Sequence, residues 1–229
     1  MTELSVLMSV RGTSEWLGEA LDSVFAQMPL DLEVLIAANG TSEHTAVWGT
    51  AQRYDLERVT VSMWDEERTL SSSLNALLGQ AAGRFVMRLD PDDQVAEKSL
   101  HTVLQYARPG GRVVYGAYLD FGTVTRIVYP KPATADRLYQ HSVGPYNYVV
   151  EAEALKHVGG WREVGYEDWD LLIRLVAAGL TPYHIGLVTL KHRVREDGRG
   201  AEFARTHAQR LEAMRQANAE WFRAMGVMP

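Results

Sequence analysis

An acidic cluster follows directly on an apolar stretch near the middle of the chain. The run Leu89-Asp90-Pro91-Asp92-Asp93 places three carboxylates within four residues. Like charges this close repel one another, so the cluster needs either a cation or full exposure to water. Mg²⁺ and Mn²⁺ prefer oxygen ligands and are often held by one or two carboxylates together with substrate phosphates. The motif therefore predicts either a metal site that assists departure of a diphosphate or a solvated turn at a strand end.

A second acidic group lies further along the chain. A glycine-containing stretch at 159–166 leads into a helical pattern whose first turn holds Glu167 and Asp168. One of these carboxylates could act as a general base that takes the proton of a hydroxyl group. Alternatively, both acids only interact favourably with the helix dipole. Asp170 and Arg174 lie four residues apart, the spacing of a surface ion pair on a helix.

The first half of the chain alternates short apolar stretches with longer amphipathic ones. We expect strands at 4–10, 32–38, 59–63 and 84–89 and helices at 14–27, 41–54 and 70–81. Ser14 is placed to cap the first helix, and Thr41 or Ser42 to cap the second. This alternation is typical of an α/β protein with a mainly parallel sheet covered by helices on both faces. Because ligands of such sheets bind beyond the carboxyl ends of the strands, segments 9–12, 38–40, 64–66 and 90–93 should share one edge.

The second half has a less regular pattern and no linker rich in Gly, Ser or Pro. We expect strands at 113–120, 124–129, 146–150 and 183–193 and helices at 152–158, 166–178 and 202–225. One continuous domain over residues 1–229 is therefore a simpler interpretation than two.

The composition excludes several classes of protein. The 229 residues include no cysteine, which rules out disulfides and thiol nucleophiles and is compatible with a reducing cytoplasm. The net charge of −6 argues against non-specific binding to nucleic acid. No apolar stretch approaches the ~20 residues of a transmembrane helix, and Leu4–Val10 is too short for a signal peptide. We expect a cytoplasmic protein without a transmembrane segment.

The order of these features resembles the family 2 glycosyltransferases of the GT-A fold. The stretches that carry the resemblance are the opening strand at 4–12, the helix at 16–27 with its Leu-x-Ser-Val-x-x-Gln pattern, the strand and turn at 32–45, the approach at 74–85, the D-x-D motif at 90–92 and the acidic motif at 166–175. They extend over residues 4–195, and their combination is more specific than any one of them.

The resemblance implies a Rossmann-like, nucleotide-diphospho-sugar transferase fold. It also implies transfer of a sugar, with inversion, from a UDP-, GDP- or dTDP-sugar to a hydroxyl group of a saccharide, a lipid-linked molecule or a small molecule. Mn²⁺ or Mg²⁺ would be bound by Asp92 and Asp90, with Asp90 near the donor's ribose or sugar and Asp93 in support. Asp168 would be the catalytic base, with Glu167 the second candidate.

Two positions depart from the family pattern at the expected donor site. Ala38-Asn39 stands where members usually carry two acids that hold the nucleotide base, although Asn39 could still hydrogen-bond a base edge without a charge. Ser9-Val10-Arg11-Gly12 replaces a Pro-Thr-Tyr-Asn-like turn. Ser9 remains a candidate donor contact, and Arg11 either touches the base or a phosphate or is solvated. Asp65 either borders the donor pocket or belongs to a solvated turn.

Basic residues follow the last expected strand. His192, Arg193 and Arg195 form either a clamp on the diphosphate, since arginine binds phosphate through a planar fork, or an ordinary polar loop.

Aromatic residues in the second half offer contacts to a sugar. Trp161 and Trp169 either stack on a sugar ring or pack in the core, and residues 146–148 are expected to border the acceptor.

Within the single domain, the resemblance divides the chain into a nucleotide-binding half at about 1–95, an acceptor half at about 96–200 and a C-terminal helix at about 201–227. An apolar face of that helix is formed by Phe203, Leu211, Met214, Trp221 and Met225. We expect this face to pack on the body of the protein, while a homodimer or a peripheral membrane contact is the alternative.

Two other functions remain open from the sequence. A sugar-phosphate nucleotidyltransferase could share the sheet and the acidic site, but it would normally carry a glycine-rich, basic loop near the N-terminus. The loop Arg11-Gly12-Thr13-Ser14 has one glycine and one arginine. A non-catalytic module that binds a nucleotide-sugar is the second alternative, and the altered Ala38-Asn39 position supports it.

Overall fold

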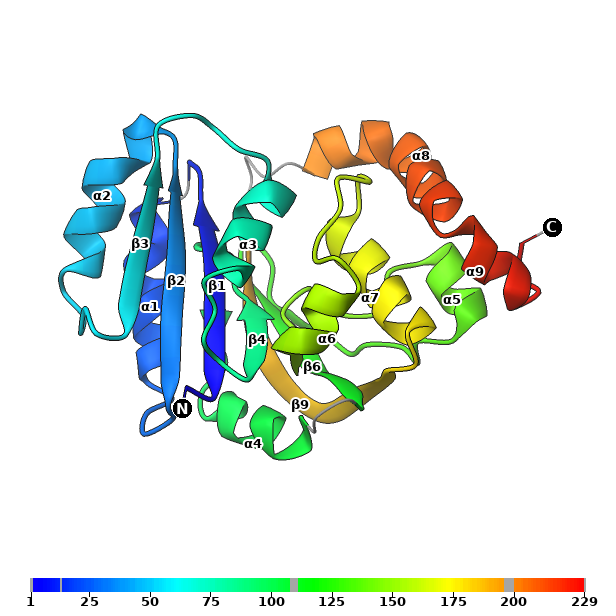
Figure 1. Cartoon of the computed structure of the whole chain (residues 1–229), viewed down its shortest axis with the longest axis horizontal. Coiled ribbons are helices and arrows are strands. Elements are labelled where there is room, and N and C mark those ends of the chain that lie inside the picture. The colour runs from blue at the N-terminus through cyan, green and yellow to red at the C-terminus, as the bar shows by residue number, and fades with distance from the viewer. Residues whose placement is uncertain (1, 13, 108–110, 196–199, 229) are drawn as a thin grey trace.

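A single mixed sheet runs through the described part of the molecule (Figure 1). The computed structural model of the chain describes residues 2–12, 14–107, 111–195 and 200–228. Within these residues the sheet has nine strands in the order β3-β2-β1-β4-β8-β6-β9-β5, and β7 pairs with β6 at the side. The GT-A arrangement expected from the sequence is an α/β fold of this kind.

The first four strands are parallel and form one end of the sheet. They are β1 (Leu4–Val10), β2 (Leu32–Asn39), β3 (Val59–Trp64) and β4 (Phe85–Arg88). Side chains of β1 alternate between two buried faces, so that Val6 and Met8 join one apolar cluster and Leu7 joins the other. This explains why β1 is apolar along its length rather than alternating with polar residues.

Helices cover both faces of these strands. The first face carries α1 (Leu17–Phe25), which follows a 3₁₀ turn η1 (Ser14–Trp16), together with α2 (Thr41–Ala51) and α4 (Ser99–Tyr106). The second face carries α3 (Leu70–Leu78). Each helix contributes a stripe of leucine, valine or alanine to its cluster, which is the interaction that holds it on the sheet.

The remaining strands extend the sheet with mixed pairing. They are β5 (Gln94–Val95), β6 (Arg112–Gly122), β7 (Arg126–Val128), β8 (Val149–Glu151) and β9 (Thr181–Val194). The short strand β8 is antiparallel to both β4 and β6, and β9 is parallel to β6. Because β8 joins β4 to β6, the acidic loop that follows β4 lies beside elements of the second half of the chain.

The remaining helices lie on the face that also carries α3. They are α5 (Ala135–Gln140), α6 (Ala152–His157), α7 (Glu167–Ala177), α8 (Gly200–Ala217) and α9 (Ala219–Ala224). Figure 1 shows α8 and α9 at the opposite end of the molecule from α2. No helix in the described part of the chain is long and apolar enough to cross a membrane.

Most strands and helices expected from the sequence are confirmed within a few residues, but the two proposed N-caps are wrong. Ser14 begins the 3₁₀ turn, so that Trp16 is the N-cap of α1 and no side chain caps the helix. Gly40 is the N-cap of α2 at φ 100°, in place of Thr41 or Ser42. Helix α5 and strand β5 were not expected, because each is short. Helix α4 was not expected either, although Leu100, Val103 and Leu104 repeat at a helical spacing and are buried.

The single terminal helix expected at 202–225 is also wrong. It is broken at Asn218, whose side-chain amide donates to the backbone carbonyl of Met214 at 2.8 Å. Phe222 is the fully buried aromatic residue of this segment, while Met225 is 52% exposed. Met214 packs in the core as expected, and the side chain of Phe203 lies outside the described residues.

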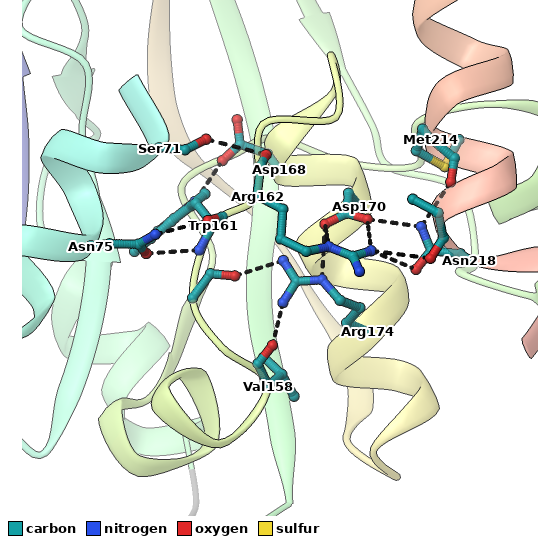
Figure 2. A network of polar contacts seen from close by, with 12 residues as sticks. Ser71, Asn75, Val158, Trp161, Arg162, Asp168, Asp170, Arg174, Met214 and Asn218 are labelled. Carbon is teal, nitrogen blue, oxygen red and sulfur yellow. Dashed lines mark hydrogen bonds and ion pairs between the residues drawn. The ribbon is translucent and has the colours of Figure 1, made fainter. Parts of the chain in front are cut away.

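Asp170 is the centre of a buried polar network, shown in Figure 2, and not part of the expected surface pair. Arg174 donates to one of its carboxylate oxygens at 2.8 Å, and Arg162 donates to both oxygens. The amide of Asn218 donates to it as well, at 2.8 Å. Arg174 also donates to the carbonyls of Val158 and Gly160.

This network joins three segments that are far apart in the sequence. It connects the loop at 158–162, helix α7 and the junction between α8 and α9 (Figure 2). Asp170 is fully buried and Arg174 largely so, so water cannot replace the hydrogen bonds between them, and the carboxylate is needed to balance the buried charge of Arg174.

We predict that Asp170→Asn lowers the free energy of unfolding by about 3 kcal/mol, because it leaves two guanidinium groups without their buried counter-charge. The matched control is Asp136→Asn, at an exposed position of α5, which should change stability by less than about 0.5 kcal/mol. Urea unfolding followed by fluorescence measures both. Equal, small losses in the two variants would contradict a central role for Asp170.

Candidate active site

The loops after the first four strands lie along one edge of the sheet, as expected. Val10 is in register with Ala38, and Asn39 is in register with Trp64. The backbone amide of Gly40 donates to the carbonyl of Trp64 at 2.9 Å. The acidic loop after β4 continues this edge toward the second half of the chain.

Arg88, the last residue of β4, is a buried cation at the centre of the site. Its side chain is 6% exposed. Nε and Nη2 donate to the two carboxylate oxygens of Asp90 at 2.9 and 3.0 Å, and Nη1 donates to Asp168 Oδ2. The guanidinium also lies over the ring of Tyr146, 4.6 Å from its centroid. One side chain therefore connects the acidic loop of the first half to the acidic helix of the second.

The acids around Arg88 keep it charged. Burial alone would lower the pKa of Arg88, but the carboxylates of Asp168, Asp90 and Glu167 raise it well above its usual value. Glu167 contributes from a greater distance, 3.8 Å between Oε1 and Nη1. The acids at 90–93 were expected to need an added cation or water, and Arg88 supplies part of their counter-charge.

Asp93 is buried and is held by two donors. The hydroxyl of Tyr146 donates to it at 2.6 Å, and the backbone amide of Arg193 donates to its other oxygen at 2.7 Å. The same tyrosine hydroxyl accepts from the backbone amide of Asp90 at 3.0 Å. Burial, and then the charge of Asp90, raises the pKa of Asp93 to about 7. Asp93 therefore supports the loop from inside the protein.

Asp92 lies beside a second carboxylate, Asp90, and has Arg195 as an ion-pair partner. Burial and the neighbouring Asp90 carboxylate raise its pKa above the usual value, and Arg195 is 3.5 Å away. Among the described residues, no group of three Asp, Glu or His side chains is arranged to hold a metal ion. Two carboxylates still fit a Mn²⁺ or Mg²⁺ ion that takes its other ligands from a diphosphate and water.

Arg193 fixes the end of β9 against the acidic loop. Its Nε donates to the backbone carbonyl of Asp92 at 2.9 Å, and its Nη2 lies 2.5 Å from Glu19. The guanidinium groups of Arg193 and Arg195 both lie over the ring of Trp16. Both arginines are thus beside Asp92, whereas His192 bonds to the buried Asp120 at 2.8 Å.

Asp168, in the first turn of α7, is bound by a donor on each oxygen. Arg88 holds Oδ2, and the indole of Trp161 donates to Oδ1 at 3.2 Å. Burial raises the pKa of Asp168 to about 6, against the opposing effect of Arg88 and with a further raising effect of Glu167. A carboxylate with this pKa is suited to accept a proton near neutral pH.

A cavity of about 580 Å³ opens beside Asp168. Its walls come from the loop at 140–146, the start of α7, strands β6 and β9 and helix α8. The lining residues are Arg88, Tyr118, Gln140, His141, Ser142, Gly144, Pro145, Tyr146, Tyr148, Gly165, Tyr166, Glu167, Asp168, Trp169, Leu172, Leu190, His192 and His207. A cavity with aromatic walls and a carboxylate at its edge can receive a ring-shaped molecule that carries hydroxyl groups.

A family model described as Glycosyl transferase family 2 matches residues 5–159, more than half of the chain. The chain belongs to glycosyl transferase family 2. Among curated relatives, the GalNAc(5)-diNAcBac-PP-undecaprenol beta-1,3-glucosyltransferase of Campylobacter jejuni is 28% identical over 117 residues, which are 51% of this chain and 38% of that protein. The chain therefore spans well under half the length of this relative.

Solved structures of similar fold include two nucleotide-sugar complexes. The mannosyltransferase PcManGT from Pyrobaculum calidifontis, in complex with GDP-Man and Mn²⁺, superposes with a TM-score of 0.73 at 19% identity, over 95% of this chain and 64% of that one. S. aureus TarS 1–349, in complex with UDP-GlcNAc, superposes with a TM-score of 0.70 at 16% identity, over 86% of this chain and 60% of that one. At these identities the likeness establishes the GT-A fold.

Asn39, where the family usually has an acid, already uses its amide inside the protein. Its Nδ2 donates to the carbonyl of Arg68 and its Oδ1 accepts from the amide of Arg68, both at 2.7 Å. It is 2% exposed, and so it holds the loop after β3 rather than presenting free polar atoms. Asp65 in that loop is exposed, and Ser9 is partly buried at the end of β1. Arg11 pairs with Glu67 at 2.5 Å.

The two tryptophans have different surroundings, although both are buried. Trp169 donates its indole N–H to the carbonyl of Leu138 at 2.8 Å and packs in the core, with one edge at the cavity. Trp161 also belongs to the core, but its indole N–H reaches Asp168. Of the residues at 146–148, Tyr146 and Tyr148 line the cavity.

Arg88, which pairs with both Asp90 and Asp168, was not among the site residues expected from the sequence. A signal was present, because an arginine inside an apolar strand needs buried partners, and acids two residues away supply one. His207 of α8 was also missed, and nothing in its sequence neighbourhood indicates that it lines the cavity.

We predict that Arg88→Gln lowers the free energy of unfolding by about 3–4 kcal/mol, because Asp90 and Asp168 lose their buried counter-charge. The matched control is Arg84→Gln, four residues earlier and exposed, which should change stability by less than about 0.5 kcal/mol. Urea unfolding in the presence of EDTA measures both variants. A loss in Arg88→Gln no larger than in the control would contradict the pairing described for Arg88.

Proposed function

We propose that the chain transfers a sugar, with inversion, from a nucleotide-diphosphate sugar to a hydroxyl group of an acceptor. The observation that carries this proposal is the position of Asp168. Its carboxylate lies at the edge of a large cavity and is connected through Arg88 to the acidic loop at the end of β4. Membership of the family supports the same activity.

Asp92 and Asp90 are the residues that would hold a Mn²⁺ or Mg²⁺ ion. When bound, such an ion neutralises the negative charge of the departing diphosphate. The raised pKa of Asp92 supports this assignment, since burial beside Asp90 makes a second negative charge costly in the absence of a cation. The presence of Mn²⁺ in the PcManGT complex supports it independently.

Of the basic residues at the end of β9, Arg195 is the one placed to act on the same diphosphate. Arg195 lies 3.5 Å from Asp92 and has no closer carboxylate partner among the described contacts, so its planar fork is available to phosphate oxygens. Arg193 is committed to Asp92's carbonyl and to Glu19, and so it orders the loop. His192 is held by Asp120 at the cavity wall.

Asp168 would take the proton of the acceptor hydroxyl as its oxygen attacks the anomeric carbon of the donor. We propose that the acceptor approaches the donor sugar from the side opposite the diphosphate, which gives inversion at the anomeric carbon. Glu167, weakly paired at 3.8 Å, is the second candidate. The aromatic walls of the cavity suit a saccharide acceptor, or the sugar end of a lipid-linked one.

The donor nucleotide would lie at the edge formed by the ends of β1, β2 and β3. Neighbours of the same fold bind GDP-Man or UDP-GlcNAc, and so donors with UDP, GDP or dTDP are the set to test. Ser9, Arg11 and Asp65 lie around this edge. Since the Asn39 amide is engaged by Arg68, we propose that it acts on the donor by holding the loop that carries Asp65.

We predict that Mn²⁺-dependent turnover of a nucleotide-sugar, measured as release of nucleoside diphosphate and abolished by EDTA, falls by about 10²–10⁴-fold in Asp168→Asn. The wild-type kcat should fall as the pH drops through about 6, because the raised pKa of Asp168 leaves the carboxylate protonated below that value. Asp136→Asn, at an exposed position, is the matched control and should retain wild-type turnover.

Three outcomes would count against this proposal. Unchanged turnover in Asp168→Asn would exclude it as the base. Release of pyrophosphate from a nucleoside triphosphate and a sugar phosphate would favour a nucleotidyltransferase. Binding of nucleotide-sugars without turnover of any donor in the wild type would favour a non-catalytic module.

A further inference from the structure

Trp161 is fixed at the boundary between the two halves of the molecule. Its backbone amide donates to Asn75 Oδ1 at 2.9 Å, and Asn75 Nδ2 donates to its backbone carbonyl at 2.8 Å (Figure 2). The preceding Gly160 has φ +64°, and a Cβ added there would lie 2.2 Å from Asn75 Oδ1. The close approach therefore requires glycine at 160 and sets the backbone of Trp161 against helix α3.

The indole of Trp161 ends at the carboxylate of Asp168. Its Nε1 donates to Oδ1 at 3.2 Å, while Arg88 donates to Oδ2. A carboxylate bound on each oxygen by a different side chain cannot rotate about its Cβ–Cγ bond without losing a donor. Trp161 is 4% exposed, so water does not replace its indole N–H.

We propose that Trp161 is a positioning residue for the catalytic base, and that its indole N–H sets the orientation of the Asp168 carboxylate toward the acceptor cavity. This inference rests on the proposed role of Asp168 in transfer. Asn75 acts as the clamp that keeps the indole in place. A pair of hydrogen bonds from Asn75 to the backbone of Trp161 holds the loop at 160–162 to α3.

Trp169 provides a comparison within the same protein. It is similarly buried, at 6% exposure, and its indole N–H also has one acceptor, the carbonyl of Leu138 at 2.8 Å. Replacement of either tryptophan by phenylalanine removes one hydrogen bond and the same volume. Only Trp161→Phe removes a donor from a carboxylate.

The groups that surround Asp168 persist in both variants. Arg88 and Asp90 face it from the β4 segment, Glu167 from α7, and the hydroxyl of Tyr148 on the adjoining loop donates to its backbone carbonyl at 3.3 Å. A donor bound to the ionised carboxylate stabilises that form, and so its loss makes protonation easier. The acid limb of the activity profile should then move to higher pH in Trp161→Phe.

The first test does not depend on turnover. The chain has six tryptophans, so ¹⁵N-labelled protein gives a small set of indole resonances, assigned by their absence in Trp161→Phe and Trp169→Phe. We expect the Trp161 resonance to move with pH in the wild type and to stay fixed in Asp168→Asn, while that of Trp169 is unaffected in both. A Trp161 resonance that does not respond to pH would overturn the inference.

The second test uses Mn²⁺-dependent donor turnover against pH. For Trp161→Phe we expect the acid limb to move up by roughly 0.5–1 pH unit and the plateau kcat to fall by roughly ten-fold, with the donor KM within about two-fold of wild type. Trp169→Phe should leave the limb in place. An acid limb at the same pH in Trp161→Phe and Trp169→Phe would mean that Trp161 is only a core residue.

A further variant, together with the combined results, separates the positioning role of Trp161 from the proposed transferase function. Asn75→Ala keeps the indole but frees its backbone, and it should move the limb in the same direction if Trp161→Phe fails to fold. Turnover that depends on Asp168 but not on Trp161 or Asn75 removes this inference alone. If the wild type shows no turnover that depends on Asp168, the proposed function fails, and the positioning role fails with it.

Discussion

The interaction on which the site depends is the binding of one buried guanidinium by two carboxylates from opposite halves of the chain. Arg88 takes both oxygens of Asp90 and one oxygen of Asp168. A cation without partners at this depth would cost several kcal/mol, so the acidic loop and the acidic helix must both be in place when the protein folds. Arg88 thereby fixes the distance between the candidate metal ligands, Asp90 and Asp92, and the candidate base, Asp168.

Other contacts hold the base helix from its far side. The buried carboxylate of Asp170, two residues after Asp168, ties α7 to the loop at 158–162 and to Asn218. The C-terminal helices are thus part of the frame of the site, and His207 of α8 also lines the cavity. A polar network with every group paired is rigid, which suits a base that must be positioned within a fraction of an ångström.

The sequence was sufficient for the parallel half of the fold, because β1, β2 and β4 are short apolar runs separated by amphipathic helices. It also identified the acids at 90–93 and 167–168, since their position at the end of a strand and the start of a helix is a local property. The local sequence could not show which polar side chains bond to partners from distant segments. Arg88 looks like one polar residue in a strand until β8 brings the second half beside β4. Asn39 and Asn218 are similar cases. The amide of Asn39 bonds to Arg68, in a loop distant in the sequence, and the amide of Asn218 bonds to the carbonyl of Met214 where the C-terminal helix breaks.

The central claim is that Asp92 and Asp90 hold a divalent cation between the protein and a diphosphate, on one side of Arg88, with Asp168 facing the acceptor on the other. A crystal structure with Mn²⁺ and a nucleotide-sugar, with diffraction data collected at the manganese absorption edge, tests it most directly. The account predicts one anomalous peak in contact with a carboxylate oxygen of Asp92 and with the diphosphate, and an anomeric carbon that faces the cavity beside Asp168. A bound nucleotide-sugar with no manganese at this loop, or with its anomeric carbon directed away from the cavity, would contradict it.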